Sequence, residues 1–139
     1  MPNSKAALWT GRAMVGLSAA FLLVASVAPK LAQADVAKEA MEPIGWSDGH
    51  LLLLGTIELA CVLLYLVPRT RILGAVLTTA LLGGAIASHL RVGSPMFSHT
   101  LFGVYLGIVM WAGAWLLDPA LRALVPLRRS AASAQSGKA

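Results

Sequence analysis

Four long apolar runs fill most of this 139-residue sequence and decide which solvent surrounds it. They cover residues 8–28, 49–67, 72–90 and 100–117. A helix needs roughly 20 mostly apolar residues to cross the hydrocarbon core of a bilayer, and each run is close to that length. Lipid offers no hydrogen bonds, so each run must satisfy its own backbone as a helix. The sequence therefore predicts an all-α fold: a transmembrane, antiparallel four-helix bundle.

Little of the chain remains outside these runs, so we expect one domain over residues 1–127 and no separate soluble catalytic domain. Only 12% of the residues are charged, against about 25% in an ordinary soluble domain. After the fourth run, Asp118 and Pro119 predict the cap and first turn of a short interfacial helix over residues 119–127. The polar residues 128–139 predict a disordered cytoplasmic tail.

Lysine and arginine are distributed unevenly between the two sides of such a bundle. The side that holds both chain ends carries eight of them and the other side three. Because basic residues are retained on the cytoplasmic side, we expect a multi-pass protein of a bacterial-type inner (plasma) membrane with both termini cytoplasmic. The net charge of +5 lies mostly at the ends of the runs, where it meets lipid head groups. We therefore expect the lipid bilayer, and no nucleic acid, as a partner.

The first apolar run allows a second interpretation. Lys5 and Arg12, the apolar stretch and the sequence Ala32-Gln33-Ala34 also fit a secretory signal peptide with its cleavage site. Cleavage would leave three spans. If the run is retained, we expect the first span to stop at Pro29, because proline cannot continue the helical hydrogen-bond ladder.

Small residues predict how the spans pack. Ala75, Thr79, Gly83 and Ala87 recur every four positions, and residues 103–107 form a GxxxG motif. Such stripes let helix backbones approach closely where no hydrophobic effect drives association. Since only a short turn joins the second and third spans, we expect these two to be the tightest antiparallel pair.

One acidic side chain, Glu58, lies near the middle of an apolar run. A carboxylate at that depth costs roughly 2.5–3.5 kcal/mol on insertion scales, so Glu58 must face the bundle and find a partner. Gly55 leaves room beside it, one turn outward. Lys30 and His89, both expected in the outer half of the bundle, are the candidate partners. The carboxyl either binds a ligand or a proton, or only fixes helix packing through an interhelical hydrogen bond.

Three histidines, His50, His89 and His99, are expected at the outer rim together with Lys30 and Arg91. No two of the histidines have the i,i+4 spacing of a helical metal pair, so no metal site is predicted. They either bond loop carbonyls or line a rim that holds the polar head of a lipid-soluble ligand. The lone cysteine cannot form an internal disulfide.

Several motifs together resemble those of the DoxX-like family of small four-span membrane proteins. They are Gly55-Thr56-Ile57-Glu58, Pro68-Arg69-Thr70, Leu73-Gly74-Ala75, Gly83-Gly84-Ala85-Ile86-Ala87-Ser88-His89 and Val27-Ala28-Pro29-Lys30-Leu31. The resemblance covers residues 8–127. It implies the four-span fold and an association with membrane redox chemistry, quinones and oxidative stress.

The same resemblance implies where function lies. Lys30, Glu58 and His89 match recurrent polar positions of the family, and Tyr65 and Arg91 are further ligand-binding candidates. The chain lacks a CxxC motif and haem-type paired histidines within the spans. We therefore expect no catalytic residue, no intrinsic cofactor and no enzyme activity of the chain on its own.

The expected function is that of an accessory or ligand-binding subunit. An outward-opening polar pocket around Glu58 would take a quinone or lipid, and a redox partner subunit or a second copy would join it. Two alternatives stay open: a small-solute or proton transporter that uses Glu58, and an assembly or scaffold protein with no ligand.

Overall fold

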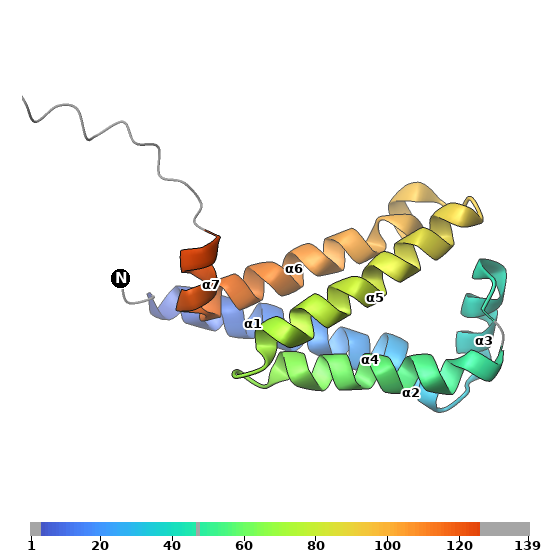
Figure 1. Cartoon of the computed structure of the whole chain (residues 1–139), viewed down its shortest axis with the longest axis horizontal. Helices are drawn as coiled ribbons and strands as arrows, with labels where there is room; N and C mark the ends of the chain where they lie inside the picture. Colours follow the sequence, from blue (N-terminus) through green and yellow to red (C-terminus); the bar gives the residue numbers. More distant parts are fainter. Residues whose placement is uncertain (1–3, 47, 126–139) are drawn as a thin grey trace, which may run out of the picture.

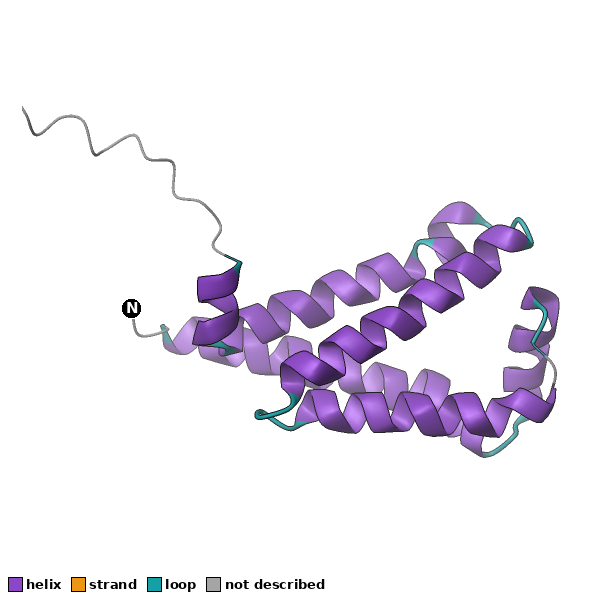
Figure 2. Ribbon diagram, viewed as in Figure 1, coloured by secondary structure: helices purple, strands orange, loops and turns teal. Residues whose placement is uncertain are grey.

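The structure is a computed structural model that describes residues 4–46 and 48–125. All regular elements of these residues are helices, which confirms the all-α prediction (Figures 1 and 2). The elements, in chain order, are α1 (Lys5–Leu22), the π-helical turn η1 (Leu23–Val27), α2 (Ala28–Leu31), α3 (Asp35–Met41), the 3₁₀ turns η2 (Glu42–Ile44) and η3 (Asp48–His50), α4 (Leu51–Leu66), α5 (Arg71–Arg91), the π-helical turn η4 (Met96–Thr100), α6 (Phe102–Leu117) and α7 (Pro119–Leu124).

Three helical stretches are long and apolar enough to cross a membrane by length and composition: Lys5–Leu31, Arg71–Arg91 and Met96–Leu117. The apolar helix α4 has 16 residues, which gives about 24 Å at 1.5 Å rise per residue, against about 30 Å of hydrocarbon. It is shorter than its sequence run because η3 forms a separate turn before it and the chain leaves the helix before Pro68. A fourth span therefore stays a prediction that depends on α4.

The long helices form a bundle that is closed at one end and splayed at the other. In Figure 1 they converge at the end that carries α7 and the α4–α5 turn, and they spread toward the end that carries α3. α1 packs against α6 and α4, and α5 packs against α4 and α6. The core lies where the helices converge, with Val62, Tyr65 and Ala114 at its centre. Tyr65 is fully buried there, and its hydroxyl donates to the carbonyl oxygen of Met110 at 2.9 Å.

The backbones of α4 and α5 approach each other very closely at Gly74, in line with the prediction for the second and third spans, but α1 and α6 have the more extensive contact. Two glycines explain this contact. A Cβ at Gly11 would lie 2.8 Å from Leu117 Cγ, and one at Gly113 would lie 3.0 Å from Met14 Cβ. The two helices approach through the space that these missing side chains leave.

The small-residue stripe on α5 also differs from its predicted role. Ala75 is buried, but Thr79, Gly83 and Ala87 are exposed, and open space surrounds a Cβ built at Gly83. The reason is that α5 diverges from α4 as it leaves the turn, so only the first part of the stripe meets the partner helix. The GxxxG motif does pack: a Cβ at Gly103 would lie 3.1 Å from Ile86 Cγ1 on α5.

A short helix, α7, follows α6 at the predicted position, and the carboxylate of Asp118 caps it by accepting from the backbone N–H groups of Ala120 and Leu121. A second short helix, α3, lies at the splayed end of the bundle (Figure 1). The predicted cytoplasmic tail and the last residues of the interfacial helix lie outside the described residues.

Candidate functional site

A widened turn carries the first helical stretch past its proline. In η1 the N–H of Ala28 donates to the carbonyl of Leu23, five residues back. Pro29 has no N–H to place, and the wide turn gives its ring room against the preceding carbonyls. The helix therefore continues past Pro29 to Leu31, whereas the sequence predicted that it would stop at Pro29. This extension holds Lys30 on the helix, four residues after Ser26.

Ser26, Lys30 and Glu58 form a compact polar cluster between α2, η1 and α4. The Lys30 ammonium lies 2.7 Å from Glu58 Oε2 and donates to Ser26 Oγ at 2.6 Å. Ser26 Oγ in turn donates to the same carboxylate oxygen at 3.0 Å. Glu58 is only 8% exposed. Glu58 thus faces the interior, and of its two candidate partners Lys30 makes the direct contact.

Gly55 allows the close approach of α2 to α4 that brings Lys30 to Glu58. A Cβ at Gly55 would lie 2.9 Å from Lys30 Cβ and 3.1 Å from Leu31 Cδ2. The missing side chain lets α2 lie directly against α4, one turn outward from Glu58. Because Lys30 Cβ is tied to the helix backbone, it could not move aside by a simple rotamer change.

We predict that Gly55→Ala separates α2 from α4 and weakens the Lys30–Glu58 pair. The expected loss is about 1–3 kcal/mol of unfolding free energy, as for other overpacked interiors. The matched control is Gly16→Ala in α1, where a Cβ meets open space. Both changes gain the same helix propensity. Unfolding of both variants by SDS titration in mild detergent measures the difference, and equal stabilities would contradict the packing role of Gly55.

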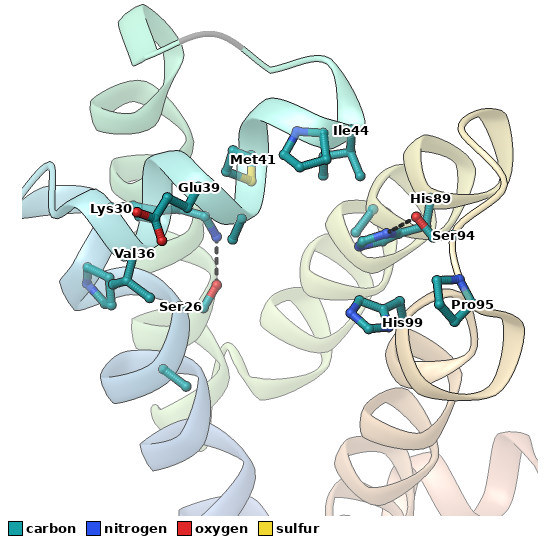
Figure 3. A pocket seen from close by; sticks show the side chains of 16 residues that line it. Ser26, Lys30, Val36, Glu39, Met41, Ile44, His89, Ser94, Pro95 and His99 are labelled. Carbon is teal, nitrogen blue, oxygen red and sulfur yellow. Dashed lines mark hydrogen bonds between the residues drawn. The ribbon is translucent and has the colours of Figure 1, made fainter.

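A cavity of about 840 Å³ opens at the splayed end of the bundle. Ser26 and Lys30 lie on one wall, and His89, Ser94 and His99 lie on the other, as Figure 3 shows. The remaining lining side chains are mostly small or apolar and come from the first helical stretch, α3, η2, α5 and the α5–η4 loop: Ala25, Pro29, Val36, Ala37, Glu39, Ala40, Met41, Pro43, Ile44, Ala85 and Pro95. Glu58 is not among the lining residues and lies behind Ser26 and Lys30.

The two histidines lie side by side on the wall opposite Lys30, which we call the far wall. Their ring centroids are 5.9 Å apart in an edge-on arrangement. The Nδ1 atom of each ring is hydrogen-bonded to a serine hydroxyl: His89 to Ser94 at 3.0 Å and His99 to Ser98 at 2.8 Å. His50 lies elsewhere on the rim, with its ring edge-on to Trp46. Within the described part of the chain, no three His, Cys, Asp or Glu residues are arranged to hold a metal ion.

Besides Glu58, two more of the residues proposed from sequence, Tyr65 and Arg91, lie outside the cavity lining. Tyr65 belongs to the core at the closed end. Arg91 donates to the carbonyl of Ile44 at 2.9 Å and so attaches η2 to the end of α5. Trp46 adds a second attachment through Ser88 Oγ at 3.3 Å. Arg91 therefore holds the segment that covers the cavity.

Sequence reasoning missed Ser26 as a member of the site, and it placed His99 at the rim without assigning it to the ligand-binding residues. Ser26 lies four residues before Lys30, a spacing that places two residues on one helix face, but this signal requires the helix to continue past Pro29, where the sequence predicted its end. His99 could not be assigned, because its place on the cavity wall depends on the π-helical turn η4.

The DoxX-like family matches this chain over residues 13–113, which include both cavity walls and the whole polar cluster. Searches of curated proteins and of solved structures gave no match.

Proposed function

Because this chain is a membrane protein that belongs to the DoxX-like family, we propose that it is an accessory or ligand-binding subunit linked to membrane redox chemistry. Its cavity would bind the polar head group of a membrane-resident amphiphile, with a quinone as the leading candidate. The chain itself would supply binding and a proton-exchanging carboxyl, and a partner protein would supply electrons.

The observation that carries this proposal is the ion pair beside the cavity. Lys30 lines the cavity while its ammonium group contacts a carboxylate that is almost completely buried. Ionisable groups inside a membrane bundle are costly, and they are usually kept where a ligand or a proton is handled. The mostly apolar lining around these few polar groups is typical of a small-molecule site.

The cluster gives Glu58 an indirect route to a bound head group. Ser26 and Lys30 each contact Glu58 and each line the cavity. A proton could pass between a ligand oxygen and the carboxyl through the Ser26 hydroxyl. Lys30 would orient the same ligand oxygen.

The test is to purify the protein in nanodiscs formed from its own membrane and to identify bound quinones and lipids by mass spectrometry. We expect wild-type protein to retain an amphiphile and Lys30→Met and Glu58→Gln to lose most of it. Lys38→Met is the matched control, because Lys38 lies on α3, pairs with Asp35 at 3.5 Å and does not line the cavity. Retention by all variants would contradict the proposal. Glu58-dependent proton flux in proteoliposomes would instead favour a transporter.

We further propose an inner-membrane location with both termini cytoplasmic, which places the cavity at the outer face. The support is the asymmetry of eight basic residues against three. Cysteines introduced singly at Ser4 and at Val36 report the two sides, after replacement of Cys61 by alanine. We predict that a membrane-impermeant maleimide labels the Val36 position in intact cells and the Ser4 position only after permeabilisation. The reverse pattern would overturn the orientation.

A further inference from the structure

We propose that the cavity has two hydrogen-bonding poles, Lys30 and Ser26 on one wall and His89 and His99 on the opposite wall. The cavity then selects an uncharged, flat head group with hydrogen-bond-accepting oxygens at both ends. This inference rests on the proposed ligand-binding function. It goes beyond that function by assigning the far wall and by defining the chemistry of the ligand that spans the two walls.

The far wall presents a pair of pre-oriented hydrogen-bond donors. Each histidine ring is fixed at Nδ1 by a neighbouring serine. When the serine hydroxyl donates to Nδ1, the neutral ring carries its hydrogen on Nε2 and donates from there. Figure 3 shows both rings extending from their backbones toward the wall that carries Lys30 and Ser26. Both histidines also line the cavity.

The near wall, which carries Ser26 and Lys30, offers a matching donor. The Lys30 ammonium has three N–H groups, and two of them contact Ser26 Oγ and Glu58 Oε2. The third is left for a ligand in the cavity that Lys30 lines. A head group that reaches both walls therefore needs an acceptor at each end.

The charges around the cavity disfavour an anionic ligand. Glu58 neutralises Lys30 at 2.7 Å, and the lining adds the carboxylate of Glu39 from α3. An anion would therefore meet no net positive charge. The rest of the cavity lining is largely apolar, including Met41, Ile44 and Pro95, which suits an uncharged ring.

The test compares two bicyclic probes that differ in the number of carbonyl groups. The first is 2,3-dimethyl-1,4-naphthoquinone, which has one carbonyl at each end of a ring, and the second is 1-tetralone, which has one in total. Binding to the full chain in nanodiscs is measured by equilibrium dialysis for wild type, His89→Phe, His99→Phe and Lys30→Met. His50→Phe is the control, because His50 does not line the cavity. Thermal melting shows that each variant is folded, and His99→Gln replaces His99→Phe if the latter does not fold.

We expect His89→Phe and His99→Phe each to weaken binding of the dione about five- to tenfold, the effect of one lost hydrogen bond, while tetralone binding stays unchanged. Lys30→Met should weaken binding of both probes, and His50→Phe should change neither. If the histidine variants bind the dione as wild type does and Lys30→Met does not, the second pole is wrong and the proposed function stands. If wild type binds neither probe, or no variant changes binding, both proposals are overturned.

Discussion

Replacement of Lys30 by methionine is expected to destabilise the protein by about 3 kcal/mol, which is typical of a buried ion pair that loses one partner. Methionine has a similar length but no charge, so packing against Gly55 changes little. Among the described residues, the Ser26 hydroxyl would then be the one donor left to Glu58. The side chains of Lys30 and Glu58 are only 16% and 11% exposed, so bulk water would solvate the unpaired carboxylate poorly. Lys30→Met should therefore unfold at clearly lower SDS than wild type.

A double-mutant cycle separates charge from packing in this prediction. Glu58→Gln removes the buried charge, so the Lys30→Met/Glu58→Gln protein should recover most of the stability that Lys30→Met alone loses. Lys38→Met, on the outer surface, should cost less than about 0.5 kcal/mol, since exposed pairs contribute little. The cycle is completed by measuring the unfolding free energies of wild type, the two single variants and the double variant by SDS titration in mild detergent. Additive losses, with the double variant as unstable as the sum, would show that the pair is not coupled.

Much of the site was predictable because membrane energetics constrain it. Glu58 had to face inward, and Gly55, one turn away, indicated room beside the carboxyl. Lys30 was a candidate partner for the same reason, since few polar groups lie at that depth. The structure places these three residues together.

The rest depended on features that periodicity does not report. The sequence predicted a helix end at Pro29, whereas the π-helical turn lets the helix continue and brings Ser26 and Lys30 onto one face. The four-helix bundle predicted from the sequence also has helices that stay parallel along their whole length. Their divergence exposes Gly83, creates the cavity, and leaves Tyr65 in the closed end. Crossing angles arise from packing of whole surfaces, and a stripe of small residues does not fix them.

Gly74 is the point from which the helices diverge, and Gly74→Ala should cost about 3 kcal/mol or more. A Cβ at this position would overlap the backbone nitrogen and Cα of Tyr65 and would lie 2.6 Å from the carbonyl carbon of Leu64. Backbone atoms cannot move aside by changing rotamer, so α4 and α5 would have to separate. The short turn at Pro68 limits that separation, and Thr70 also holds it closed through a 2.8 Å bond from its hydroxyl to the Leu64 carbonyl. The expected effect is at or above the upper end for overpacking.

Gly83→Ala and Gly84→Ala are the matched controls on the same helix, because open space surrounds a Cβ at both positions. All three substitutions gain similar helix propensity, up to about 1 kcal/mol, so the difference between them isolates the clash. SDS unfolding should place both controls near wild type and Gly74→Ala far below. If the three variants unfold together, α4 and α5 do not meet at Gly74. The α4–α5 contact would then not hold together the closed end of the splayed bundle that forms the cavity.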